Sequence, residues 1–92
     1  MTRRRGRPPK PIRLSAHARA YVDRRGFTEA EVVDAVRTGR WQPARGGRLE
    51  TYKDFVYNQD WNGVRYATKR VRPVFVEEQH EIIVVTVYTY FF

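Results

Sequence analysis

Hydrophobic and polar positions change their period once along the chain, near residue 39. Before this point, apolar residues recur at helical spacing, first in Ala18, Tyr21 and Val22 and then in Val32 and Val36. After it, β-branched and aromatic residues dominate in runs that turn residues separate. This order predicts an α+β fold, with two N-terminal helices packed on one face of a three- to four-stranded antiparallel sheet.

Capping signals mark the ends of both predicted helices. Ser15 can cap a first helix that runs from residue 16 to about residue 25, and Gly26 suits the left-handed position after it. Residues 28–31 have the pattern of a capping box, with Phe27 placed to pack on the helix that follows. We expect this second helix to end at Gly39.

Three strand-like runs follow a Pro/Gly turn region at residues 42–48. The first covers residues 49–57 and precedes a loop at 58–63, in which Asn62 and Gly63 form a strong hairpin-turn signal. Residues 64–76 predict one long strand or two, and Pro73 marks an edge position, a bulge or a break. Residues 81–92 predict a last strand whose nearly continuous apolar character favours cover on both faces, or a partner chain along it.

Charge divides the chain into a tail and a domain. The chain has 92 residues, with 18 Lys and Arg against 10 acids, for a net charge of +8. Residues 1–13 carry six bases and no acid, so we predict a disordered basic tail there and one folded domain at 14–92. No cysteine occurs, which excludes a disulfide scaffold, a thiolate zinc site and a cysteine nucleophile. We expect no metal, no cofactor, no membrane partner and a cytoplasmic protein.

The tail carries one short motif with a physical rationale. Arg5-Gly6-Arg7-Pro8 and the nearby Lys10 resemble an AT-hook, in which arginines enter the narrow minor groove of A·T-rich DNA. The motif makes Arg5, Arg7 and Lys10 candidate nucleic-acid-binding residues. The alternative is a solvated basic tail, or one that docks on an acidic partner.

The first predicted helix brings a histidine close to arginines. His17, Tyr21, Arg24 and Arg25 follow one another at spacings that place them on neighbouring turns of one side. A histidine flanked by arginines suits proton transfer at a phosphodiester. The alternative is a surface histidine beside solvated arginines.

A basic stretch lies in the long strand region. No acid occurs between Trp61 and Val76, and strict alternation places Arg70 and Arg72 on one face and Arg65 with Lys69 on the other. Basic residues interleaved with aromatic ones on a sheet suit a nucleic-acid backbone with stacked bases. The alternative is a charged strand whose bases pair with the glutamates of residues 77–81.

The last strand places hydroxyl groups on one face. Thr86, Tyr88 and Tyr90 point opposite to Ile83, Val85 and Val87 under strict alternation, and their hydroxyls can donate to phosphate oxygens. The alternative is ordinary strand propensity, since Thr and Tyr are both good strand residues.

Several of these pieces together carry a family resemblance. The segments are His17-Ala18, RGFT at 25–28, EVV at 31–33, GGR at 46–48 and IVVTVY at 83–88. They resemble a small bacterial family of unknown function that is grouped with RelE-type toxins, within the barnase–EndoU–colicin–RelE ribonuclease superfamily. The resemblance covers residues 14–90 and implies two helices packed on an antiparallel sheet with an open, basic face.

The resemblance also implies a chemistry, the metal-independent cleavage of RNA by attack of the ribose 2′-hydroxyl. It implies one proton-transfer group, cations for the phosphorane and hydroxyls that orient the phosphate. In that order these are His17, then Arg25 and Lys69 with Arg70 or Arg72 as alternates, then Thr86 and Tyr88.

Three functions follow as hypotheses. The first is a ribonuclease toxin of a toxin–antitoxin pair, with RNA and an acidic antitoxin protein as partners and a homodimer as a further arrangement. The second is a non-catalytic nucleic-acid-binding protein that uses the tail and the basic sheet face. The third is an interaction protein that binds an acidic partner.

Overall fold

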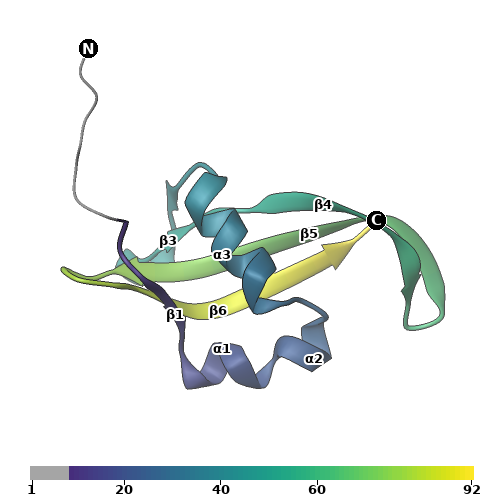
Figure 1. The fold of residues 1–92 in the computed structure, drawn as a ribbon, viewed down its shortest axis with the longest axis horizontal. Coiled ribbons are helices and arrows are strands. Elements are labelled where there is room, and N and C mark those ends of the chain that lie inside the picture. The colour runs from purple at the N-terminus through teal and green to yellow at the C-terminus, as the bar shows by residue number, and fades with distance from the viewer. Residues whose placement is uncertain (1–8) are drawn as a thin grey trace, which may run out of the picture.

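The computed structural model describes residues 9–92, and within them the chain is an α+β protein with three helices and a six-stranded sheet (Figure 1). Arg5 and Arg7 lie outside the described residues. The elements in chain order are β1 (Ile12–Leu14), α1 (Ala16–Ala20), α2 (Val22–Arg25), α3 (Glu29–Thr38), β2 (Gln42–Pro43), the 3₁₀ turn η1 (Arg45–Gly47), β3 (Leu49–Glu50), β4 (Lys53–Trp61), β5 (Val64–Glu77) and β6 (Ile82–Phe91).

The sheet follows the order β1-β6-β5-β3-β2, and β4 pairs with β5 farther along the same edge as β3. All pairs are antiparallel except β1 with β6, which is parallel. The expected three or four strands are therefore too few. The reason is that β1, β2 and β3 contain only two or three residues each, too few for a period of two to be visible.

The first predicted helix is interrupted at Tyr21. This residue has φ −102° and ψ 4°, and it divides the segment into α1 and α2. Both predicted ends are confirmed, because Ser15 Oγ accepts a hydrogen bond from the Ala18 N–H at 3.1 Å and Gly26 has φ 73°. The break lets α2 turn so that Arg25 Nη1 donates to the Val87 carbonyl oxygen on β6 at 2.8 Å.

The capping box predicted for α3 is confirmed. Thr28 Oγ1 accepts from the Glu31 N–H at 3.1 Å, and Glu31 Oε1 accepts from the Thr28 N–H at 3.0 Å. Gly39 follows the helix as predicted. It has to be glycine because a Cβ there would lie 2.1 Å from Thr51 Oγ1 and 2.7 Å from the Ala35 carbonyl oxygen.

The β4–β5 hairpin has the predicted two-residue turn, with φ 52° at Asn62 and φ 83° at Gly63. The loop expected at 58–63 is wrong, because β4 continues to Trp61. A bulge between Val56 and Gln59 makes this possible, with Asn58 in the left-handed region at φ 48°. The hairpin therefore extends well beyond the rest of the sheet (Figure 1).

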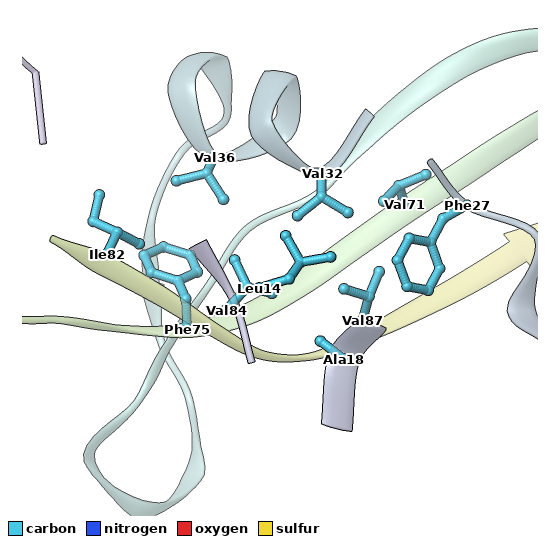
Figure 2. Packing of buried hydrophobic residues seen from close by; sticks show 10 residues of the cluster. All are labelled: Leu14, Ala18, Phe27, Val32, Val36, Val71, Phe75, Ile82, Val84 and Val87. Atoms are coloured by element: carbon cyan, nitrogen blue, oxygen red, sulfur yellow. The ribbon is translucent and has the colours of Figure 1, made fainter. Parts of the chain in front are cut away.

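The hydrophobic core fills the space between the helices and one face of β5 and β6. Figure 2 shows α3 directing Val32 and Val36 toward this face, with Phe27 at one end and Ile82 at the other. The cluster consists of Leu14, Ala18, Phe27, Val32, Val36, Val71, Phe75, Ile82, Val84 and Val87. No helix within residues 9–92 is long and apolar enough to cross a membrane.

Residues 10–13 belong to the fold, so the predicted boundary between residues 13 and 14 is wrong. Strand β1 pairs with β6 from Ile12 onward, and the Ile82 N–H donates to the Pro11 carbonyl oxygen at 2.9 Å. Lys10 forms an ion pair with Glu77 at 2.9 Å. Backbone pairing and ion pairs fix this segment, and neither of them depends on the apolar content from which the boundary was predicted.

Strand β6 has different neighbours in its two halves. Residues 82–84 lie between β1 and β5, and from Val85 onward β5 is the only paired strand within the described chain. Of the three alternatives for Pro73, a bulge is found close by, between Val74 and Phe75 in the pairing of β5 with β6. The second neighbour of β5 changes from β4 to β3 between Val71 and Val74. This bulge shifts which residues of β6 share a face.

Candidate functional site

The sheet has one face under the helices and one open face, and strand alternation sorts the residues of β5 between them. Val71 is fully buried under the helices, whereas Arg70 and Arg72 point to the open face. The register places Tyr90 of β6 opposite Arg70, and Tyr88 opposite Arg72. Cations and aromatic rings therefore alternate across the open face.

Two adjoining hollows form a groove at one end of this face. The first has a volume of about 520 Å³ and the second about 480 Å³, and they share Arg48, Thr86 and Tyr88. We call the two hollows together the groove. The first is lined by Pro43, Ala44, Arg45, Arg48, Glu50, Arg72, Val74, Thr86 and Tyr88, and the second by Ser15, His17, Arg48, Val85, Thr86 and Tyr88.

Helix α1 brings His17 to the groove. Its cap residue Ser15 bonds in two directions, since its Oγ accepts from the Ala18 N–H and donates to the Val85 carbonyl oxygen on β6 at 3.3 Å. The first turn of α1 is therefore fixed beside β6. His17 is exposed, and its ring lies 4.9 Å from that of Tyr21.

Arg25 reaches from the end of α2 to the wall of the groove. Its Nη1 donates to Thr86 Oγ1 at 3.3 Å and to the Val87 carbonyl oxygen at 2.8 Å. The guanidinium lies 4.1 Å from the centroid of the Tyr21 ring and 5.2 Å from that of Tyr88. Because no carboxylate between residues 9 and 92 lies within 4 Å of it, this well-positioned cation keeps its charge uncompensated.

Arg70 and Arg72 lie on the open face as predicted, but each is paired with an acid. Arg72 donates to Glu50 at 2.7 Å and to the Tyr90 hydroxyl at 3.0 Å, and Arg70 donates to both carboxylate oxygens of Asp54 at 2.7 and 3.0 Å. The hydrogen bonds from Arg70 lower the pKa of the Asp54 carboxyl below its usual value. Their partners come from β3 and β4, and not from the glutamates of residues 77–81 that the alternative interpretation named.

Lys69 does not belong to the groove, so its predicted grouping with His17 and Thr86 is wrong. Its side chain is 8 % exposed and points under the helices, where Nζ lies 2.9 Å from Glu31 Oε1 and 3.0 Å from the Gly26 carbonyl oxygen. Neighbouring residues of a strand point to opposite faces. Lys69 therefore joins the ends of α2 and α3 to the sheet.

Two other predicted nucleic-acid-binding residues also lie away from the groove. Arg65 is at the hairpin tip, 3.8 Å from Asp60. Lys10 lies at the opposite end of the sheet, where it forms an ion pair with Glu77 and donates a hydrogen bond to the Glu78 carbonyl oxygen. Arg5 and Arg7 stay predictions, since they lie outside the described residues.

The sequence assigned no role to Arg45 and Arg48, yet both line the groove. They flank Gly46 and Gly47, whose φ values of 68° and 74° shape the tight turn between β2 and β3. Within the described chain neither arginine has an ion-pair partner. The pattern Arg-Gly-Gly-Arg was the available signal, because glycines in a turn leave flanking cations accessible.

The groove therefore combines one histidine, two lining arginines with uncompensated charge and the hydroxyls of Ser15, Thr86 and Tyr88. A third such arginine, Arg25, bonds Thr86 in its wall, and this set of groups suits an anionic ligand. Residues 9–92 hold no group of three or more His, Cys, Asp or Glu side chains that could bind a metal ion. No family model, curated protein or solved structure matches the chain.

Proposed function

We propose that the chain is an endoribonuclease that cleaves RNA in the groove by attack of the ribose 2′-hydroxyl, with no metal in the reaction. One observation carries the proposal. His17, Arg48, Thr86 and Tyr88 line the same hollow although they come from a helix, a turn and a strand far apart in the chain. A proton-transfer group, a cation and two hydroxyls around one concave site are the groups that this reaction needs.

The arginines supply the electrostatic part. Attack on the phosphorus gives a pentacoordinate phosphorane with additional negative charge on its oxygens, and fixed cations stabilise that charge. Arg25 and Arg48 are suited to this role because their charges are uncompensated within residues 9–92. Arg72 is already bound by Glu50 and Tyr90 and contributes less.

His17 and Tyr88 supply the proton transfers. The imidazole of His17 accepts the proton of the 2′-hydroxyl while the 2′-oxygen forms its bond to phosphorus. The bond from phosphorus to the 5′-oxygen breaks, and the Tyr88 hydroxyl donates a proton to that oxygen. The products are a 2′,3′-cyclic phosphate and a free 5′-hydroxyl, and Tyr88 recovers its proton through solvent from His17.

A toxin role, with an acidic antitoxin protein as its partner, is part of the same proposal. Its support is the resemblance together with the uncompensated positive charge of Arg25, Arg45 and Arg48 at the groove. An acidic segment placed there would exclude RNA. A homodimer and A·T-rich DNA stay predictions from the sequence.

The second candidate function is nucleic-acid binding without cleavage. The observation that favours it is the open face beyond the groove, where Arg70 lies against the rings of Tyr52 and Phe92 with no proposed proton-transfer group beside it. Such a surface binds nucleic acid and needs no chemistry.

The experiment that separates the two candidates is the mapping of product ends. Purified full-length chain is incubated with single-stranded RNA in a chelator, beside the same RNA with 2′-deoxyribose at the mapped position. Fragments that end in 2′,3′-cyclic phosphate, and their absence from the deoxy substrate, would support cleavage by 2′-hydroxyl attack. Binding to both substrates without fragments would establish the second function.

A further inference from the structure

Strand β6 and the residue that follows it present a row of three exposed aromatic side chains on the open face. Tyr88, Tyr90 and Phe92 alternate with inward-pointing residues, and 39 %, 43 % and 55 % of their surfaces are exposed. Successive members lie roughly 7 Å apart, which is twice the rise of a strand residue. We call these three residues the aromatic row.

Arginines of β5 lie over the rings of the row. The Arg72 guanidinium lies 4.9 Å from the centroid of the Tyr88 ring and 5.8 Å from that of Tyr90, while Arg70 lies 5.4 Å from that of Phe92. Glu50 and Asp54 hold these guanidinium groups in place and balance their charge. The arginines therefore stiffen the row and polarise its rings, and attract phosphate only weakly.

The row begins in the groove. Tyr88 lines both hollows, together with Arg48, and Arg45 lines the larger one. An anionic polymer that is bound by these uncompensated cations can continue along Tyr90 and Phe92 without a break. Charge complementarity at the start of the row and flat aromatic surface along it favour one occupant, a nucleic-acid strand with unpaired bases. A duplex keeps its base faces inside its own stack and cannot use such a surface.

We propose that the aromatic row is a base-stacking platform for single-stranded RNA that leaves the groove. The inference rests on the proposed function of the groove and names the substrate class, an RNA that is unpaired on one side of the cleaved bond. Two parts of the surface bind different parts of the RNA. Arg45 and Arg48 bind phosphates, and Tyr90 and Phe92 bind bases.

The test uses 2′-O-methyl oligonucleotides, which have no free 2′-hydroxyl and cannot be cleaved by this mechanism. Fluorescence anisotropy with the full chain compares a single strand, the same strand in a duplex and the same strand with abasic positions. The single strand should bind most tightly. Each of the substitutions Tyr90→Leu and Phe92→Leu should lower its affinity about 5- to 100-fold, because a stacked base is lost.

Salt dependence distinguishes stacking from phosphate contact. With Arg48→Ala the slope of log affinity against log salt should become shallower by about 0.7, the value for one phosphate of a single strand. With Tyr90→Leu the slope should stay unchanged. Val56→Ala is the matched control, because Val56 is 86 % exposed and lies close to the end of the row. Val56 pairs with Thr68 on β5, and the backbone of Thr68 is hydrogen-bonded to that of Phe92. The control substitution should alter neither quantity.

Two results would overturn the platform. Equal affinity for the intact, abasic and duplex oligonucleotides would show that bases are not bound. A dimer in sedimentation that Tyr90→Leu dissociates would assign the row to a second copy of the chain. Cleavage is measured separately on ordinary RNA, so loss of the platform leaves the groove chemistry standing, and loss of cleavage leaves the binding test informative.

Discussion

Lys69 and Arg70 are neighbours on β5, and the two faces of the sheet give them different environments. Lys69 lies under the helices, where it binds Glu31 and the Gly26 carbonyl oxygen and is almost fully buried. Arg70 lies on the open face beside aromatic rings and binds an exposed aspartate. Lys69 therefore stabilises the fold, and Arg70 forms part of a surface on which a ligand can lie.

A further contrast separates the strands from the turns. The outward arginines of β5 are already paired with acids of β3 and β4, whereas Arg45 and Arg48 in the turn before β3 have no acidic partner between residues 9 and 92. Regular strands bring complementary side chains into register. In this protein the turn and the end of α2 supply the uncompensated charge at the site, and the strands supply the supporting surface.

The largest expected effect is at the groove. His17→Ala should lower the rate of RNA cleavage about 10²- to 10⁴-fold, because it removes general acid–base help. The free energy of unfolding should change little, since His17 is exposed. Cleavage rates and thermal melts of the same preparations provide the measurement.

His80→Ala is the matched control for that variant. His80 is also exposed but lies at the β5–β6 turn, where it lines a different hollow. Its rate should equal that of the wild type. Equal loss in both variants, or no loss with His17→Ala, would contradict the assignment of His17.

The second effect is on the helix side. Lys69→Met should lower the free energy of unfolding by about 2–3 kcal/mol, because it leaves Glu31 as a largely buried charge without its partner. Cleavage per folded molecule should be unchanged. Denaturant titration beside Arg65→Met, in which the replaced cation is exposed at the hairpin tip, isolates the contribution of burial. Unchanged stability together with a large loss of cleavage would contradict this and would show that Lys69 acts at the site.

A smaller effect tests the start of α3. Thr28→Ala should cost about 1 kcal/mol of stability, because the Glu31 N–H loses its cap. Thr28→Ser keeps the hydroxyl and should retain most of the stability in the same thermal melts. Similar losses in both variants would mean that the methyl group matters and the cap does not.

The smallest effect concerns acid on the open face. Hydrogen bonds from Arg70 lower the pKa of Asp54 in the folded chain, so the pair contributes stability above the unfolded value of about 4 and loses it as the pH falls through the folded pKa. The contribution should be small, because solvent screens an exposed pair. Asp54→Asn should flatten the fall in stability below pH 4 (roughly the unfolded pKa). A fall as steep as that of the wild type would place the acid sensitivity elsewhere.

Local signals in the sequence were enough to predict the elements that local interactions build. The capping box at Thr28, the left-handed Gly26 and the Asn62-Gly63 turn each depend on a few adjacent residues, and all three are confirmed. Contacts between distant segments were not predicted. Strand β1 pairs with β6 across most of the chain, and the bulge at Asn58 changes where β4 ends.

The candidate site was predictable to a similar extent. Alternation correctly placed Arg70 and Arg72 opposite to Lys69, and the resemblance named His17, Thr86 and Tyr88, which the structure brings together at one hollow. Lys69 was misplaced because the sequence does not show which face the helices cover. Arg48 was missed because a turn residue has no periodicity, and its position depends on how β2 and β3 pair.

The most direct test of the difference between the two faces is an NMR titration of the full chain with a 2′-O-methyl single-stranded oligonucleotide. The account predicts that amide and side-chain signals shift for Arg48, Thr86, Tyr88 and Tyr90, while those of α3 and the Lys69 ammonium stay in place. Shifts that centre on α3 and Lys69, with the open face unchanged, would contradict it.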